Sequence, residues 1–251
     1  MLFRSIRKHL SLLKGGGLVK IAYPATIIGL IFSDVPGDNF QEVASGPTYK
    51  DETTIRDAEN LINKYNLGNF SLIETTKEDK YFEKVHNFVL VSNKTPILKI
   101  EKRVKELGLN AKVISTDLYD EVSVAVKKIF DELKDNTVVL AAGEPKLKVA
   151  GNLGTGGRNL YMALKSTQLN DFGNGEVFVS LASDGMDNGP AAGAFVDKLT
   201  IEKIQSINID IKKYLDNFDA YTVFEKTQDL IMTGPTDANV SDLMILLKKD
   251  E

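Results

Sequence analysis

Short apolar runs alternate with amphipathic segments along this 251-residue chain, and this alternation restricts the possible folds more than any other feature. The apolar runs have the length of strands, and each ends at small or polar residues. They are 25–34, 88–92, 111–115, 137–142 and 177–183. Continuous apolar runs of this length are typical of strands buried on both faces, as in a parallel sheet.

Helical periodicity appears between several of these runs. Apolar residues three and four positions apart mark one face in 53–66, 97–107 and 119–133. Thr53 or Asp51 stands where the first of these helices would be capped. Strands that alternate with helices predict an α/β protein.

Glycine-bearing loops and a new strand–loop–helix series begin after residue 133. We therefore expect two α/β domains, 1–133 and 134–251.

Composition excludes several kinds of partner and site. The net charge is -4 and the pI about 5.4, which disfavours nucleic acid because binders of phosphate backbones carry a basic face. There is no cysteine, which excludes disulfides and thiolate metal sites and fits a reducing compartment. The apolar run ATIIGLIF is too short to cross a bilayer. We expect a cytoplasmic protein with no membrane partner.

The stretch VAGNLGTGGRNLYMAL, residues 149–164, concentrates glycine beside a fixed positive charge. Gly154, Gly156 and Gly157 precede Arg158 and Asn159, just before a helical run. Backbone N–H groups of glycine loops converge on anions, and a helix N-terminus adds partial positive charge. Arg158 adds a planar donor fork that suits a carboxylate or a phosphoryl oxygen. The stretch is neither a P-loop nor a good dinucleotide fingerprint, and such glycines are often only turn formers.

Two further loops follow predicted strands and carry acidic and small polar residues. SDVPGDNFQEVASGPT follows 25–34, and SDGMDNGPAAGA follows the strand run that ends at 183. Aspartates of this kind are oxygen ligands for magnesium beside phosphates, and with Arg158 they suit phosphoryl transfer. Any one loop alone is more often a turn. From the residues alone we predict an anion-binding α/β protein, with a kinase as one candidate.

Five motifs occur in an order that adds a family to this prediction. RKHLSLLKGG, SDVPGDNFQEVASGPT, GGRN, SDGMDNGPAAGA and TGPTDANVSDL together resemble the two-domain glycerate 2-kinases, whose C-terminal half is called the MOFRL domain. The similarity runs from residue 4 almost to residue 247. It implies a partial Rossmann-like parallel sheet in 1–133 and a MOFRL-type α/β domain in 134–251.

The resemblance also implies an activity and the residues that serve it. The reaction is ATP- and magnesium-dependent transfer of a phosphoryl group to the 2-hydroxyl of D-glycerate, in a cleft between the domains. Arg158 would grip the substrate carboxylate or the moving phosphoryl group, and Asp184 would orient or deprotonate the acceptor hydroxyl or hold magnesium. The implied nucleotide or phosphate contacts are Ser33, Asp34, Ser45, Gly46, Thr48, Gly154, Gly156 and Gly157. Substrate contacts are His9, Lys14 and Asn159, and metal ligands are Asp38 and Asp187. We expect Arg158 and Asp184 to face one shared hollow.

The chain also departs from the family pattern. Gly17 stands where the family tends to have a basic residue, AGEP replaces GGET, and Asn188 is inserted in the SDG loop. Family members begin earlier, with a glycine-rich loop and a catalytic lysine. We therefore expect a companion N-terminal polypeptide or a homo-oligomer to complete the site. The alternative is a non-catalytic module that binds a nucleotide or a small hydroxy acid; a nicotinamide-dependent reductase is less favoured because no dinucleotide fingerprint follows a first strand.

Overall fold

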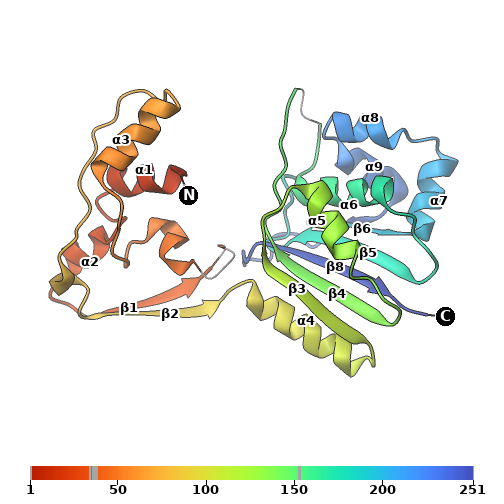
Figure 1. Cartoon of the computed structure of the whole chain (residues 1–251), viewed down its shortest axis with the longest axis horizontal. Helices are drawn as coiled ribbons and strands as arrows, with labels where there is room; N and C mark the ends of the chain where they lie inside the picture. Colours follow the sequence, from red (N-terminus) through yellow and green to blue (C-terminus); the bar gives the residue numbers. More distant parts are fainter. Residues whose placement is uncertain (1, 34, 36–38, 152–153, 251) are drawn as a thin grey trace. The chain divides into compact units, whose positions relative to one another are not determined.

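The computed structural model describes residues 2–33, 35, 39–151 and 154–250. The chain divides into two compact units, 1–91 and 92–251 (Figure 1). This division differs from the boundary that we expected near 133. The reason is that β3 (Asn110–Leu118) pairs in parallel with β4 (Thr137–Gly143), so both strands belong to one sheet of the second unit.

The first unit is built around a small parallel sheet of two strands, β1 (Ile27–Phe32) and β2 (Val85–Val91). Its helical elements are α1 (Leu2–Leu10), α2 (Gly17–Ala22), η2 (Phe40–Ser45), α3 (Ile55–Lys64) and η3 (Asp79–Tyr81). Helix α3 begins at a capping box, because Thr54 accepts the Asp57 N–H and Asp57 accepts the Thr54 N–H. Its apolar core is small and centres on Ile6, Ala58 and Ile62.

One face of the β1–β2 sheet is apolar and exposed. Ile28, Leu30, Phe32, Phe88 and Leu90 are each at least half exposed. We expected both strands to be buried on both faces, and this expectation is wrong for the unit as described. An apolar run specifies that a strand can be buried, but burial requires a second layer of structure on that face.

The second unit contains a six-stranded mixed sheet in the order β3-β4-β8-β5-β6-β7. Its other strands are β5 (Glu176–Ala182), β6 (Gly193–Asp197), β7 (Leu230–Ile231) and β8 (Asp242–Lys248). Its helices are α4 (Lys94–Glu106), α5 (Val122–Phe130), α6 (Arg158–Leu169), α7 (Lys198–Ser206), α8 (Ile211–Asp216) and α9 (Ala220–Thr227).

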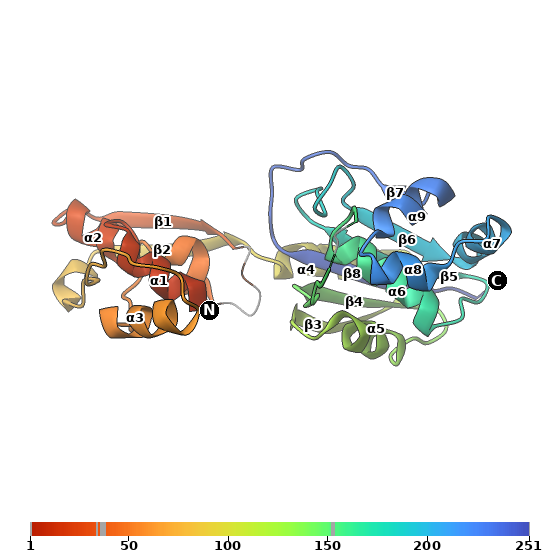
Figure 2. The same cartoon turned by 90° about the horizontal axis from the view of Figure 1, so that it is seen from above.

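Alternate residues of β4 lie in two different apolar cores. Val139 and Ala141 pack in the larger core, which includes residues of α5, α6 and α9. Val138, Leu140 and Ala142 pack in a second core with residues of α4. Since successive side chains of a strand point to opposite faces, helices cover this part of the sheet on both sides (Figure 2).

The expected parallel sheet is present only in part. The pairs β4–β8, β8–β5 and β5–β6 are antiparallel. Burial on both faces depends on covering helices and does not depend on strand direction, so the apolar runs do not reveal this order. The α/β fold class is confirmed, with a partial parallel sheet followed by a second sheet unit. None of the helices in the described residues has the length and apolarity needed to cross a bilayer.

Candidate functional site

A cavity of about 730 Å³ opens in the second unit, a size typical of ligand sites. The glycine loop before α6, the loops that follow β4 and β5, and the start of β8 line it. Arg158 and Asp184 both line this cavity, so the two residues share one hollow. The acidic and basic side chains among the described lining residues are Glu144, Lys146, Arg158, Asp184, Asp187 and Asp242.

Arg158, the first residue of α6, is held by two carboxylates of different exposure. Its Nε donates to Oδ2 of Asp242 and its Nη2 to Oδ1 of the same carboxylate at 3.3 Å. Its Nη1 donates to Oε1 of Glu144 at 2.9 Å. Asp242 is buried at the start of β8, whereas half of the Glu144 side chain is exposed. The guanidinium therefore has one buried edge and one edge toward the cavity.

The charges in this pair shift one another's pKa. Burial alone would lower the pKa of Arg158, but the Asp242 carboxylate, with Glu144 and Asp187, raises it overall. Burial raises the pKa of Asp242, and the Arg158 hydrogen bond and charge offset this only in part. Arg158 is thus a permanent cation at the cavity.

Asp187 caps helix α6 from another loop. The residue before the helix, Gly157, has no side chain to cap it, and Asp187 accepts the N–H groups of Asn159 (3.2 Å) and Leu160 (2.7 Å). Burial raises the pKa of Asp187, opposed by these hydrogen bonds. The Asp187 carboxylate therefore caps this helix N-terminus, and the binding of a ligand anion beside it stays a prediction.

The glycine loop is shaped by neighbouring parts of the unit. A Cβ on Gly157 would lie 2.3 Å from Oδ1 of Asp187, and one on Gly154 would lie 2.4 Å from the Cβ of Asp219. The Gly154 N–H donates to the carbonyl of Asn217. These close approaches explain part of the glycine content without a ligand. Gly154, Gly156 and Gly157 line the cavity, and their contact with a phosphate stays a prediction.

Asp184 and Asn159 differ in what they offer to a ligand. Asp184 lies in the turn after β5, where its Oδ1 accepts the Met186 N–H at 3.0 Å, and its side chain borders the cavity. Asn159 is buried, donates to Asp187 and accepts from the Ser180 hydroxyl at 2.7 Å. Asn159 therefore organises the cap of α6, although the sequence suggested a substrate contact.

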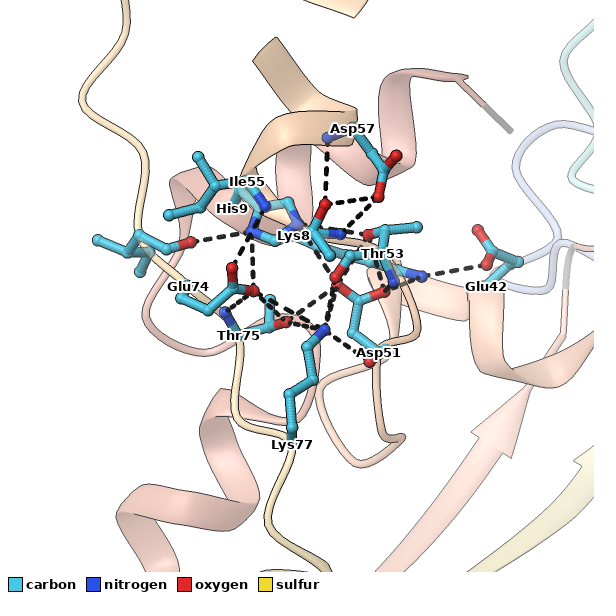
Figure 3. Close-up of polar contacts among 12 residues, drawn as sticks. Lys8, His9, Glu42, Asp51, Thr53, Ile55, Asp57, Glu74, Thr75 and Lys77 are labelled. Atoms are coloured by element: carbon cyan, nitrogen blue, oxygen red, sulfur yellow. Dashed lines mark hydrogen bonds and ion pairs between the residues drawn. The ribbon is translucent and has the colours of Figure 1, made fainter. Parts of the chain in front are cut away.

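His9 lies in a buried polar network of the first unit (Figure 3). Its Nδ1 donates to the carbonyl of Ile73 at 2.9 Å, and its Nε2 lies 3.3 Å from the hydroxyl of Thr53. Its side chain is fully buried, so it presents no surface to a substrate in this structure.

Asp51 is the centre of this network. Its carboxylate accepts from Thr53, from Thr75 and from Lys8, whose Nζ lies 3.2 Å from Oδ1. Lys77 donates to the backbone carbonyl of Asp51. Burial alone would raise the pKa of Asp51, but the Thr53 hydrogen bonds and Lys8 lower it overall. The network joins α1, the start of α3 and the segment around Thr75.

The remaining predicted residues of the first unit differ in their contacts. Lys14 donates to the carbonyl of Ala44, and Thr48 to Oδ1 of Asn87 in β2. Ser33 is buried, and its hydroxyl donates a hydrogen bond to the carbonyl of Val35 and accepts one from the Val35 N–H. Ser45 is buried, and its hydroxyl has no hydrogen-bond partner among the described residues. A Cβ on Gly46 would lie 2.6 Å from the Gln41 carbonyl, which accounts for glycine at this turn.

The predicted metal ligands do not form a preformed metal site within the described residues. Asp34 and Asp38 lie outside them. Within the described ranges, no group of three or more His, Cys, Asp or Glu residues is placed to hold a metal ion. Asp187 is engaged by N–H donors and Asp242 by Arg158.

Neither Asp242 nor Glu144 was predicted from the sequence as a partner of Arg158. Glu144 follows β4 directly, and Asp242 is the first residue of β8. Each carboxylate lies beside a buried strand, but this local pattern does not indicate the residue with which it pairs. The contact of Asp242 with Arg158 spans 84 positions and is decided by the antiparallel pairing of β8.

Comparisons with known proteins identify relatives of this chain and structures with the same fold. The model of the MOFRL family matches residues 137–242, and a domain of unknown function, DUF4147, matches residues 3–75. A glycerate 2-kinase of Pyrococcus horikoshii is 33% identical, with 97% of this chain and 60% of the relative covered. A putative hydroxypyruvate reductase of Agrobacterium vitis is 30% identical, with 97% and 68% covered. The crystal structure of glycerate kinase from Thermotoga maritima superimposes with a TM-score of 0.84 at 30% identity, with 98% of this chain and 63% of that chain covered.

The fold and the match over residues 137–242 thus show an α/β protein with a MOFRL domain. The chain belongs to the glycerate 2-kinase family. It spans about 60% of the length of the Pyrococcus relative.

Proposed function

We propose that this chain serves the phosphorylation of D-glycerate at its 2-hydroxyl, with ATP as donor and 2-phosphoglycerate as product. The observation that carries the proposal is the cavity that Arg158 and Asp184 share in a member of this family. A permanent cation and a carboxylate on one hollow suit a reaction that depends on positioning and charge neutralisation. The absence of cysteine fits a cytoplasmic setting.

Each of the two residues has a distinct role in this proposal. The Arg158 guanidinium offers planar N–H donors to the carboxylate of glycerate or to the transferred phosphoryl group. Asp184 orients the 2-hydroxyl and accepts its proton as general base. Ser33, Ser45, Gly46 and Thr48 remain the predicted nucleotide contacts of the first unit.

We propose that magnesium binds to this site together with the nucleotide. The described carboxylates do not form a metal cage, since those of Asp187 and Asp242 are engaged within the protein. In phosphoryl-transfer sites the ion is commonly held by one or two carboxylates together with substrate phosphates.

The companion polypeptide that we expected is part of this proposal, and the chain covers 60% of the Pyrococcus relative. The exposed apolar face of β1–β2 supports this part of the proposal. A polypeptide that adds parallel strands and covering helices would bury Ile28, Leu30, Phe32, Phe88 and Leu90. A homo-oligomer that buries the same face is the competing arrangement, and sedimentation of the purified chain distinguishes the two.

The test is direct synthesis of product. The purified chain is incubated with Mg-ATP and D-glycerate, alone and with a polypeptide comprising the part of a glycerate 2-kinase relative that this chain does not cover. Phosphorus NMR should show 2-phosphoglycerate in at least one mixture. Its absence from both would favour the non-catalytic module.

Arg158→Ala tests the residue that carries the proposal. Removing a donor to a developing charge costs about 100- to 1,000-fold in turnover. Arg103→Ala is the matched control, because Arg103 is an exposed arginine that also pairs with a glutamate. Equal turnover in the two variants, with circular dichroism showing both folded, would remove Arg158 from the mechanism.

A further inference from the structure

The two carboxylates that hold Arg158 are not equivalent. Asp242 contacts the Nε and Nη2 edge, and its side chain is almost completely buried. It also opens β8, where it is paired with Gly143 of β4 and Ala182 of β5 in the sheet register. The backbone at Asp242 is therefore held on both sides, and the buried carboxylate would lose its ion pair without gaining water if it left Arg158.

Glu144 occupies the other edge and is free to leave it. Its side chain is 48% exposed and lies just beyond the end of β4, with Nη1 of Arg158 at 2.9 Å. An exposed arginine–glutamate pair contributes little net free energy, so a ligand replaces it at small cost. Rotation of the Glu144 side chain into solvent needs no change in the sheet.

The charges around the cavity show why this exchange matters. Carboxylates outnumber cations among the described residues that line the cavity. The carboxylates are Glu144, Asp184, Asp187 and Asp242, and the cations are Arg158 and Lys146. An anion therefore binds favourably in this cavity only if it gains hydrogen-bond donors from the protein. Nη1 of Arg158, now bound to Glu144, is such a donor on the cavity side.

We infer that Glu144 is a displaceable counter-ion, which occupies the outer edge of Arg158 until a carboxylate or phosphoryl group takes its place, while Asp242 keeps the guanidinium in position. The inference rests on the proposed role of Arg158. Glu144 thereby sets the affinity of the site for anions, and Asp242 is a positioning residue.

The experiment measures anion binding by calorimetry, with D-glycerate and inorganic phosphate as probes. Glu144→Gln keeps the size of the side chain and removes the competing charge. It should bind at least one probe about two- to five-fold more tightly than the unmodified chain, as expected for loss of an exposed ion pair. A gain with D-glycerate alone identifies the carboxylate as the replacing group, and a gain with phosphate alone identifies the phosphoryl group.

Two controls separate displacement from a change in general structure or charge. Glu106→Gln removes an equally exposed glutamate that pairs with Arg103, and it should leave both affinities unchanged. The double variant Glu144→Gln/Arg158→Ala should lose the gain, because the effect passes through Arg158. A gain that persists in the double variant would overturn the inference.

The remaining outcomes distinguish this inference from the proposed function. Unchanged or weaker binding in Glu144→Gln, or no binding of either probe by both proteins, overturns the inference. If 2-phosphoglycerate still forms in that case, the proposed function stands by itself. Tighter binding that requires Arg158, in a protein that makes no 2-phosphoglycerate with any added polypeptide, supports the anion site and removes the kinase proposal.

Discussion

The two units of this chain build their sheets from similar apolar runs but leave them in different states. In the second unit, β4 is buried along its whole length, because helices cover both of its faces. In the first unit, β1 exposes every second residue, and a buried polar network surrounds Asp51. The same kind of sequence therefore produces a covered sheet only where the chain supplies the covering layer.

The contrast has consequences for function. The cavity with Arg158 and Asp184 lies wholly within the second unit, on a sheet that carries its own apolar core. The first unit carries the motifs that we predicted to contact the nucleotide, and one apolar face of its sheet is exposed. The described residues of the proposed anion site are thus positioned by the packing of the second unit.

The largest expected effect comes from replacing one leucine by alanine in each of the two sheets. Leu140→Ala empties a fully buried position of β4 and should cost about 2–5 kcal/mol in unfolding free energy. Leu30→Ala removes the same atoms from a side chain that is 61% exposed and should stay within about 0.5 kcal/mol. Urea denaturation of both variants checks this. A loss at Leu30 as large as that at Leu140 would mean that the β1–β2 face is already covered in solution.

A smaller effect is expected where the glycine loop meets Asp187. Gly157→Ala places a methyl group 2.3 Å from a carboxylate oxygen and should cost about 1–3 kcal/mol, with weaker capping of α6. Gly189→Ala is the control, because an added methyl there meets no described atom within 4 Å. Thermal denaturation and the amide NMR signals of α6 report the change. If the two variants behave alike, the internal explanation for Gly157 fails.

The smallest effect is a pH response of opposite sign in the two units. The pKa of Asp51 is lowered in the folded protein. Its contribution to the free energy of unfolding is therefore complete above the ordinary pKa of about 3.9, and it is lost as the pH falls through the lower folded pKa. The pKa values of Asp187 and Asp242 are raised by burial, so these groups favour folding as the pH falls from their folded values toward about 3.9. Carbon NMR titration of the carboxyl groups should place Asp51 below that value and the other two above it.

Much of the candidate site was predictable because its signals are local. Glycines before an arginine at a helix start predicted the loop and α6, and Asp184 after an apolar run predicted a carboxylate beside it. The strands 137–142 and 177–183 were predicted to within a residue or two of β4 and β5. The partner of Arg158 was not predictable, because Asp242 reaches it only through the position of β8 between β4 and β5.

The sequence by itself indicated five of the strands, β1 to β5, and the helices α3 to α6, since side-chain periodicity acts over a few residues, and its ordered motifs indicated the family. The tertiary structure decided the rest. It placed Asp187 at the N-terminus of α6, buried Asn159 and His9, and left one face of β1–β2 exposed. These outcomes depend on which distant segments meet, and that is set by packing over the whole fold and has no signature in local spacing.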